Sequence, residues 1–237
     1  MEQYIKDNDL DKILAQASAK EAFAPNWDDL VRLHQIIRQR KSFTVLEFGV
    51  GYSTIIMADA LSKNQQDWEN LGDAPKIRNR FMFKLFSVDA SKKWIEEAKK
   101  KIPTNLLPYV EFNYSPLSIG TFNGQLCHYY KKIPDIVPDF IYLDGPDPKD
   151  VKGKINGLSF QCDDRTVMAG DLLLMESTFL PGTFIIVDGR TNNARFLANN
   201  FKRKYGIKWD KAGDVTTLEL NEERLGRHNV LGKDFFH

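Results

Sequence analysis

Apolar residues follow two different patterns along this chain. In the first 42 residues their spacing is helical, and a stripe that begins after Asn26 comprises Leu30, Leu33, Ile36 and Ile37. From residue 43 onward, short β-prone runs alternate with helically spaced segments. The predicted strands are 44–48, 83–88, 109–113, 139–143, 183–187, 207–209 and 215–220, and the predicted helices are 54–61, 92–101 and 193–205.

Strands that alternate with helices predict a parallel sheet with helices on both faces. The run 139–143 is apolar at consecutive positions, as expected for a strand that is covered on both sides. The last two strands are close enough to form a hairpin, with Gly213 and Asp214 in its turn. We therefore expect an α/β fold with a doubly wound, mostly parallel seven-stranded sheet. Residues 1–42 would form a helical N-terminal extension and residues 43–237 a single α/β domain.

Two connections lack a clear pattern. Residues 62–82 are polar and irregular, and we expect them to form an insertion on the surface. Residues 115–137 include Gly120 and Gly124, and long loops in compact domains often carry function. This second connection is therefore a candidate for part of a pocket wall.

The composition narrows the classes of partner. The 33 basic residues nearly balance the 32 acidic ones, so no overall charge attracts nucleic acid. No apolar run approaches the roughly 20 residues of a membrane span, and the first residues carry charges where a signal peptide would be apolar. Cys127 and Cys162 belong to no CxxC motif and have no histidine at zinc spacing. We expect a cytoplasmic protein that binds neither nucleic acid nor a membrane.

A glycine-rich turn, Glu47 to Thr54, joins the first predicted strand of the domain to its helix. Its glycines allow close approach of a ligand to the backbone, and the following helix start attracts a carboxylate or a phosphate. Asp89 ends the second strand, where a carboxylate can accept two hydrogen bonds from a ribose diol. Its alternative role is to cap the helix that begins near Ser91. The two features together indicate a nucleotide-like ligand.

Three segments in this order resemble motifs of the class I S-adenosylmethionine-dependent methyltransferases: VLEFGVGYST, SVDAS and DFIYLDG. The resemblance covers residues 43–220 and rests on the combination, because each motif is degenerate. It implies that Asp89 holds the ribose, that the start of the 115–137 connection lies near the adenine, and that Asp144 faces the methyl-transfer site. The other implied cofactor-binding residues are Glu47, Gly49, Gly51, Tyr52, Ser53 and Ala90. Gly49 and Asp89 are 40 positions apart, whereas such folds typically need about 20, and the 62–82 insertion accounts for the difference.

Two other classes share the architecture. A nicotinamide-dependent enzyme needs a third glycine where this chain has Thr54, which places that class behind the methyltransferases. A non-catalytic nucleotide-binding or scaffold protein would keep the fold without turnover. Binding of S-adenosylmethionine, of NAD, or of neither separates the three.

Candidate catalytic groups follow adjacent strands. Asp144 and Asp188 would meet in the crevice at the carboxyl ends of the strands, and either can remove the proton of a hydroxyl acceptor. His128 is a third candidate base, although a histidine among aromatic residues is more often simply packed. Two carboxylates would also suit a divalent cation. Because cation-dependent relatives usually continue with Asp or Asn where this chain has Gly189, we leave the metal unassigned.

Residues just past the fifth strand are the candidates for acceptor binding. Arg190 suits an anionic group, and Asn192 and Asn193 can hydrogen-bond hydroxyls. Oxygen is the favoured acceptor atom, because the site holds two aspartates and lacks the Asn-Pro-Pro-Tyr motif of many amino-group methyltransferases. We expect a small-molecule acceptor, such as a sugar or secondary-metabolite hydroxyl. The sequence leaves open whether the chain forms a homodimer and whether the tail 224–237 covers the site.

Overall fold

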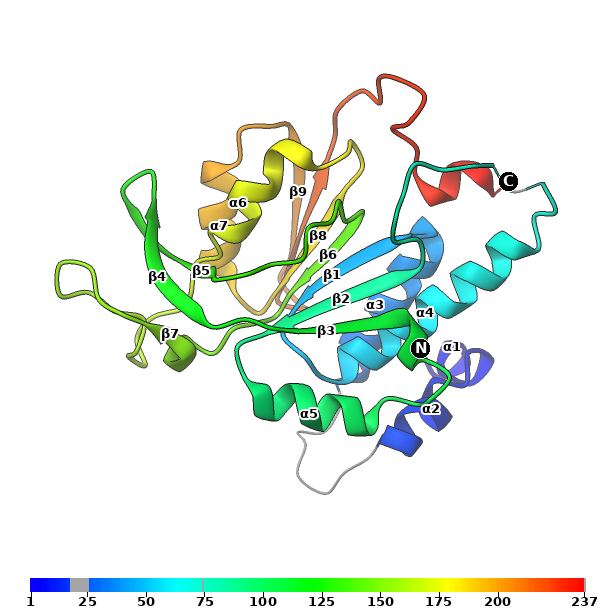
Figure 1. Cartoon of the computed structure of the whole chain (residues 1–237), viewed down its shortest axis with the longest axis horizontal. Helices are drawn as coiled ribbons and strands as arrows, with labels where there is room; N and C mark the ends of the chain where they lie inside the picture. Colours follow the sequence, from blue (N-terminus) through cyan, green and yellow to red (C-terminus); the bar gives the residue numbers. More distant parts are fainter. Residues whose placement is uncertain (18–25, 74, 237) are drawn as a thin grey trace.

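The computed structural model describes residues 1–17, 26–73 and 75–236. The strands of its main sheet are β1 Thr44–Phe48, β2 Lys84–Asp89, β3 Val110–Tyr114, β6 Phe140–Leu143, β8 Phe184–Asp188, β9 Tyr205–Asp210 and β10 Val215–Leu220. They form a seven-stranded sheet in the order β3-β2-β1-β6-β8-β10-β9 (Figure 1). The first five strands of this order pair in parallel, whereas β10 is antiparallel to both β8 and β9. This confirms the predicted mostly parallel seven-stranded sheet and its closing hairpin.

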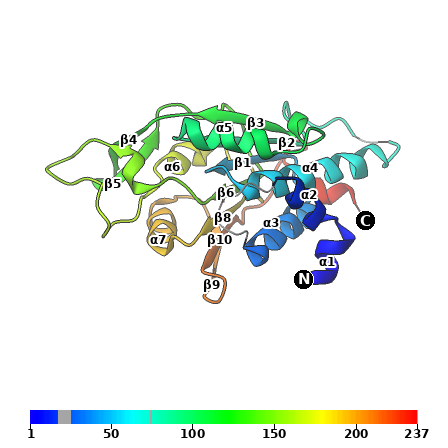
Figure 2. The same cartoon turned by 90° about the horizontal axis from the view of Figure 1, so that it is seen from below.

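The helices are α1 Glu2–Asp7, α2 Leu10–Ala17, α3 Trp27–Arg40, α4 Tyr52–Glu69, α5 Lys92–Lys101, α6 Asp171–Met175 and α7 Thr191–Asn200. Short 3₁₀ helices occupy η1 Leu107–Tyr109, η2 Pro148–Asp150, η3 Glu176–Thr178 and η4 Gly232–Phe235. Helices α3 and α4 lie together on one face of the sheet, and α6 and α7 lie on the other (Figure 2). The sheet is therefore doubly wound, as predicted.

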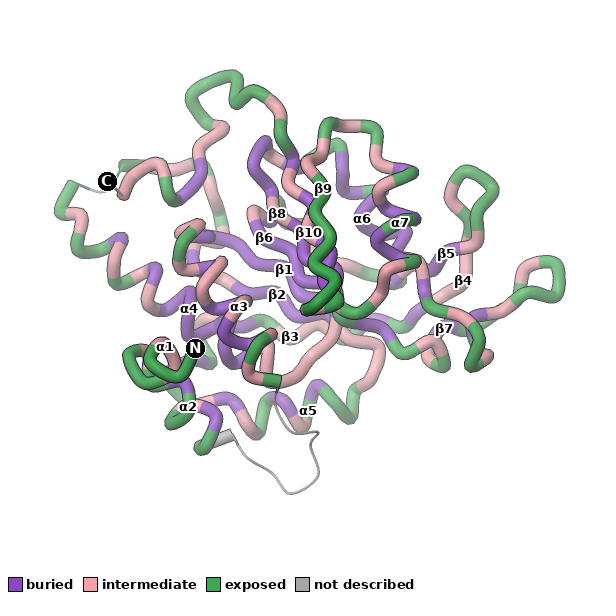
Figure 3. Tube along the Cα trace, turned by 180° about the vertical axis from the view of Figure 1, so that it is seen from behind, coloured by how far each residue is buried: buried purple, intermediate pink, exposed green. Residues whose placement is uncertain are grey.

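The central strands are buried on both faces. Every residue of β1 and β6 is buried, and the burial-coloured trace shows the same for the middle of the sheet (Figure 3). Because successive strand side chains point to opposite faces, Val45 packs with Ile56 of α4, whereas Leu46 packs in the cluster that contains Leu197 of α7. Two apolar cores, one on each face of the sheet, thus hold the strands whose ends carry the site.

The prediction of a surface insertion at 62–82 was wrong in its first part. Helix α4 continues through these residues to Glu69. Asn64 is buried and its side-chain amide donates to the carbonyl oxygens of Ile37 and Ser42, both at 3.1 Å, while Trp68 packs against Phe43. The inner face of this part of the helix is therefore formed by a polar residue and a single aromatic residue. It lacks the regular apolar spacing from which a helix is predicted.

The 115–137 connection was also read wrongly as a loop. It contains the hairpin of β4 Leu117–Phe122 and β5 Gln125–Tyr130, which with β7 Val151–Lys152 forms a separate three-stranded sheet. Asn123 and Gly124 make its two-residue turn with φ of 48° and 74°, and positive φ at both central positions is the type I′ pattern that matches the twist of two strands. The doubly wound sheet therefore has a hairpin where a crossover helix is usual.

Three smaller findings complete the fold. Helix α7 ends at Asn200, and Tyr205 already belongs to β9, so the predicted helix 193–205 was too long. Helices α2 and α3 both contact α4, and the domain boundary expected after residue 42 stays a prediction. In the part of the chain that the structure describes, no helix is both long and apolar enough to cross a membrane.

Candidate functional site

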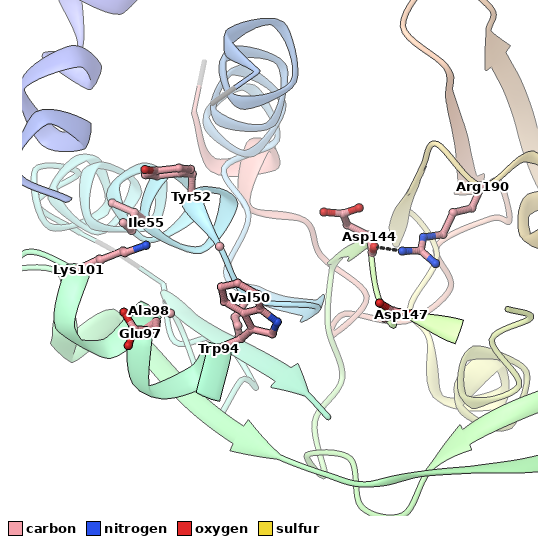
Figure 4. Close-up of a pocket in the computed structure, with 11 residues that line it drawn as sticks. Val50, Tyr52, Ile55, Trp94, Glu97, Ala98, Lys101, Asp144, Asp147 and Arg190 are labelled. Carbon is pink, nitrogen blue, oxygen red and sulfur yellow. Dashed lines mark hydrogen bonds between the residues drawn. The ribbon is translucent and has the colours of Figure 1, made fainter. Parts of the chain in front are cut away.

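A cavity of about 540 Å³ opens at the carboxyl ends of the parallel strands, which is where open α/β sheets bind their ligands. Three parts of the chain line it: the start of α4, the exposed side of α5, and the ends of β6 and β8 (Figure 4). The size is in the range of small-molecule sites. The predicted crevice is therefore present at the predicted edge of the sheet.

The two glycines of the first turn have different surroundings. Gly49 has φ of 113°, a conformation that other residues rarely adopt, and a Cβ at Gly145 would lie only 3.0 Å from the carbonyl oxygen of Phe48, so glycine is required at Gly49 for the turn and at Gly145 for the approach of the two loops. Gly51 precedes α4 and lines the cavity, and a Cβ there would meet only the Ser53 hydroxyl, at 4.0 Å. The backbone N–H of Gly51 donates to the Thr54 hydroxyl at 3.1 Å, so a side chain is absent here but this N–H is paired.

Glu47 is buried and accepts three hydrogen bonds. Its donors are the hydroxyls of Ser53 at 2.5 Å, Thr54 at 2.7 Å and Ser87 at 2.7 Å. Burial raises the pKa of Glu47 to about 7, against the opposing effect of these hydroxyls. The predicted residues Glu47 and Ser53 thus join β1, β2 and the start of α4. Tyr52, in contrast, lines the cavity.

Asp89 ends β2 beside the glycine turn. One carboxylate oxygen accepts the backbone N–H of Ser91 at 2.6 Å, and the backbone N–H of Val50 also bonds this carboxylate. Burial raises the pKa of Asp89 to about 6. The hydroxyl of Ser91 caps α5 by accepting the backbone N–H of Trp94, so Asp89 is not needed as the cap. Ala90 follows and packs partly buried against the core.

Asp144, Asp188 and Arg190 come together at the ends of β6 and β8. The Asp144 side chain is exposed. The protein around it nevertheless desolvates the carboxylate and raises its pKa to about 6, and the Asp188 charge acts in the same direction. Tyr142 donates its hydroxyl to Asp188 at 2.5 Å. Arg190 donates to the carbonyl oxygen of Asp144 at 2.5 Å (Figure 4) and to that of Pro146 at 2.9 Å. Asp144 and Arg190 therefore line the cavity together, whereas Asp188 does not line it and is held by Tyr142.

Three other predicted residues, Asn192, Asn193 and His128, do not line the cavity. Asn192 is exposed on the first turn of α7, and Asn193 is buried, with its side-chain oxygen accepting the backbone N–H of Ala169 at 2.9 Å. His128 is fully buried on β5, where burial lowers its pKa to about 3. The structure does not bring His128 to Asp144. No group of three or more His, Cys, Asp or Glu side chains arranged for a metal ion occurs within residues 1–17, 26–73 and 75–236.

Sequence reasoning missed several residues at this crevice. Trp94, 49% exposed on the first turn of α5, and Lys101 line the cavity, as does Asp147 in the loop after β6. Burial and then the Asp188 charge raise the pKa of Asp29, at the start of α3, although Asp29 does not line the cavity. A tryptophan on a lysine-rich helix right after Asp89 was the available signal. Nothing in the sequence pattern pointed to Asp29.

No family model and no curated protein sequence matches this chain. Among solved structures, it is similar to a protein from Klebsiella pneumoniae assigned to the O-methyltransferases, with 18% identity, 90% of each chain covered and a TM-score of 0.47. It is also similar to the O-methyltransferase from Bacillus cereus in complex with SAH, with 15% identity, 93% of this chain and 90% of that chain covered, and a TM-score of 0.44. The O-methyltransferase TomG from Streptomyces achromogenes, in complex with SAM, matches with 15% identity, 93% and 87% covered, and a TM-score of 0.44. Because these TM-scores lie below 0.5, we base the functional proposal on the chain's own site.

Proposed function

We propose that this chain is an S-adenosylmethionine-dependent methyltransferase that acts on a hydroxyl oxygen of a small molecule. One observation carries the proposal. A single cavity is bounded at one side by Gly51, whose missing side chain leaves the start of α4 open, and at the other by Asp144, a carboxylate with a pKa raised to about 6. The first suits the amino-acid part of the cofactor, and the second suits proton removal from an acceptor.

The residues around the cavity fit the cofactor in its separate parts. The start of α4, where the helix dipole is positive, suits its carboxylate. Asp89 would take the ribose hydroxyls, since it ends β2 beside the turn and its pKa of about 6 leaves it ionised at neutral pH. Trp94 offers an aromatic face on α5 and lines the same cavity. Tyr52 lines the cavity as well, and the Lys101 ammonium lies 5.9 Å from its ring centre.

When bound, the cofactor supplies an electrophilic methyl carbon on a positively charged sulfur. The acceptor oxygen forms the new bond to that carbon, the carbon–sulfur bond breaks and its electron pair stays on sulfur. Asp144 takes the hydroxyl proton, so the products are the methyl ether, the demethylated cofactor and a protonated carboxyl group. Arg190 fixes the loop that carries Asp144 through the two carbonyl oxygens, and alignment of this kind is the main requirement of a direct displacement.

Calorimetric titration with S-adenosylhomocysteine, and then with NAD, tests the proposal. We expect micromolar binding of S-adenosylhomocysteine and none of NAD. Asp89→Ala should weaken that binding at least about 100-fold, because two charge-assisted hydrogen bonds are lost, each worth about 1.5–3 kcal/mol. Asp147→Asn is the matched control. It lines the same cavity, but its carboxylate caps η2 through the backbone N–H of Lys149.

Three outcomes would contradict the proposal. Binding of NAD alone would favour the nicotinamide enzymes, and silence with both ligands would favour the scaffold class. Tight binding of S-adenosylhomocysteine without methyl transfer to any of a panel of hydroxyl compounds would favour a non-catalytic binding protein.

A further inference from the structure

Three buried polar side chains lie close to the crevice without hydrogen-bond partners for some of their atoms. Within the part of the chain that the structure describes, these atoms are both ring nitrogens of His128, the hydroxyl of Tyr130 and the side-chain nitrogen of Asn193. The three residues are 0%, 6% and 0% exposed. A fold normally pairs such groups, because each unpaired one is unfavourable. We call these three residues the polar recess.

The recess residues adjoin one another through a single backbone segment. His128 and Tyr130 lie on the same face of β5, with ring centres 6.1 Å apart. The backbone of His128 pairs with the segment 168–170, through Met168 at 2.8 Å and Gly170 at 3.0 Å. Asn193 accepts the backbone N–H of the middle residue of that segment, Ala169. The hairpin and the start of α7 therefore meet at the recess.

The recess also adjoins the candidate catalytic residues. The Tyr130 ring stacks on Phe48, the last residue of β1, with centres 5.3 Å apart. Arg190 lines the cavity. Burial lowers the pKa of His128 and raises that of Tyr130, and the Arg190 charge acts to lower both values. Its guanidinium also holds the carbonyl oxygen of Asp144. Arg190 thus faces the cavity and acts on the recess.

The free atoms define the chemistry of a ligand. Asn193 already uses its oxygen, so it offers N–H donors, and Tyr130 offers a hydroxyl. Burial keeps His128 uncharged at neutral pH, so it offers one donor and one acceptor. Asp89 and Asp150 act on the Tyr130 hydroxyl as nearby negative charges, and the Arg190 charge opposes them. An anion would lose its hydration among these buried side chains, whereas a neutral oxygen would find several donors at a lower cost of desolvation.

We propose that the polar recess binds a neutral oxygen group, a hydroxyl or a carbonyl, of the methyl acceptor, and that it selects neutral acceptors over carboxylates. This inference rests on the proposed methyltransferase function, because it takes the ligand to be the methyl acceptor. The chemical class of the ligand follows from the unpaired side-chain atoms.

Stability and ligand binding should move in opposite directions at Tyr130. Tyr130→Phe keeps the ring on Phe48 and removes only a hydroxyl without a partner, so Tm should rise or stay unchanged. Tyr205→Phe is the matched control, because the Tyr205 hydroxyl is also buried and unpaired, but its ring stacks on Phe201 at 4.4 Å, near the opposite edge of the sheet. A lower Tm in Tyr130→Phe alone would show that the hydroxyl has a partner, and would overturn the proposal.

Binding is tested with phenol and benzoate, which share a ring and differ in charge. The readout is the NMR signal of the ¹³C-labelled His128 ring, assigned by its loss in His128→Gln. We expect phenol to shift this signal with saturation, benzoate to leave it in place, and Tyr130→Phe to weaken phenol binding about fivefold, as for one neutral hydrogen bond. Tyr205→Phe should bind phenol as the wild type does.

The outcomes separate the recess from the proposed function. A signal that phenol does not move, or that benzoate moves equally, overturns the recess even if S-adenosylhomocysteine binds. A phenol-dependent shift that needs Tyr130, in a protein that does not bind S-adenosylhomocysteine, keeps the neutral-ligand site and removes the methyltransferase function.

Discussion

Glu47 shows how a single buried carboxylate ties the site to the stability of the fold. Its pKa in the folded chain is about 7, above the ordinary value of 4.5, because it is buried. The folded state therefore binds this proton more tightly than the unfolded state does. The resulting stabilisation is complete below pH 4.5 and is lost as the pH rises through 7.

Glu47→Gln should remove this contribution. We expect the free energy of unfolding of the wild type to fall more steeply between pH 5 and pH 8 than that of the variant, by up to about 3 kcal/mol. Urea unfolding at the two pH values measures the difference. Identical pH dependence in both proteins would mean that Glu47 is ionised throughout, contrary to the effect of its burial.

Asp144 leads to a prediction about the pH dependence of catalysis. Although this side chain is exposed, the protein around it and then the Asp188 charge raise its pKa to about 6, and a general base acts only when it is ionised. We expect kcat/KM to fall as the pH drops below 6, and Asp144→Asn to lower kcat by about 100-fold or more. The variant should bind S-adenosylhomocysteine as the wild type does. A flat profile from pH 5 to 8 with full activity in Asp144→Asn would exclude this residue as the base.

At the scale of elements, the ring of Tyr129 packs between the β4–β5 hairpin and the start of α6. A Cβ at Gly170 would lie 2.4 Å from the Tyr129 ring, and one at Gly120 would lie 2.7 Å from the same ring. The ring therefore occupies a space that both glycines keep free. This contact adds to the backbone hydrogen bonds between His128 and the segment 168–170.

Gly170→Ala should lower stability by about 1–3 kcal/mol, because the new methyl group overlaps the Tyr129 ring. The double variant with Tyr129→Leu tests the cause, since removing the ring removes the overlap. We expect Gly170→Ala to cost measurably less in that background in a thermal unfolding series. An equal cost in both backgrounds would mean that the ring is not the obstacle.

The elements that were predicted correctly are those whose apolar residues have a regular period. Each of the seven strands of the main sheet is placed within a few residues. The central strands β1, β6 and β8 are buried parallel strands, which appear as continuous apolar runs, and β9 and β10 are marked by the turn between them. The end of α4 was missed because Asn64 and Trp68, and not a row of leucines, form its inner face. The hairpin was missed because its strands are half-buried and contain glycine and histidine, so neither an apolar run nor a clean alternation marks them.

At the scale of the whole molecule, the two ends of the parallel strands have different roles. The carboxyl ends border the cavity, which is lined by residues from both halves of the chain. The sequence could place Asp144 and Asp188 there because strand ends meet at a known edge. It could not place Trp94, since only the packing of α5 brings it to the crevice. It also could not show that Glu47 is fully engaged by hydroxyls, because that depends on three separate contacts.

The C-terminal tail packs near the amino ends of the strands. Phe235 packs against Trp68 with ring centres 5.3 Å apart, and a Cβ at Gly232 would lie 1.9 Å from the carbonyl oxygen of Lys41. The tail thus lies at the far ends of α3 and α4, away from the cavity. This answers whether residues 224–236 cover the site, since the residues of η4 do not line it.

Gly232→Ala should therefore separate stability from binding. The new methyl group meets backbone and cannot be accommodated by a side-chain rotation, so we expect a loss of at least about 2 kcal/mol of stability. The dissociation constant for S-adenosylhomocysteine at 20 °C should stay within twofold of the wild type, because the overlap lies near the amino ends of the strands. Thermal unfolding and calorimetry on the same preparation measure both quantities. If the variant were to lose cofactor binding while still folded, the two ends of the strands would be coupled through α4, whose first turn borders the cavity and whose last turn carries Trp68.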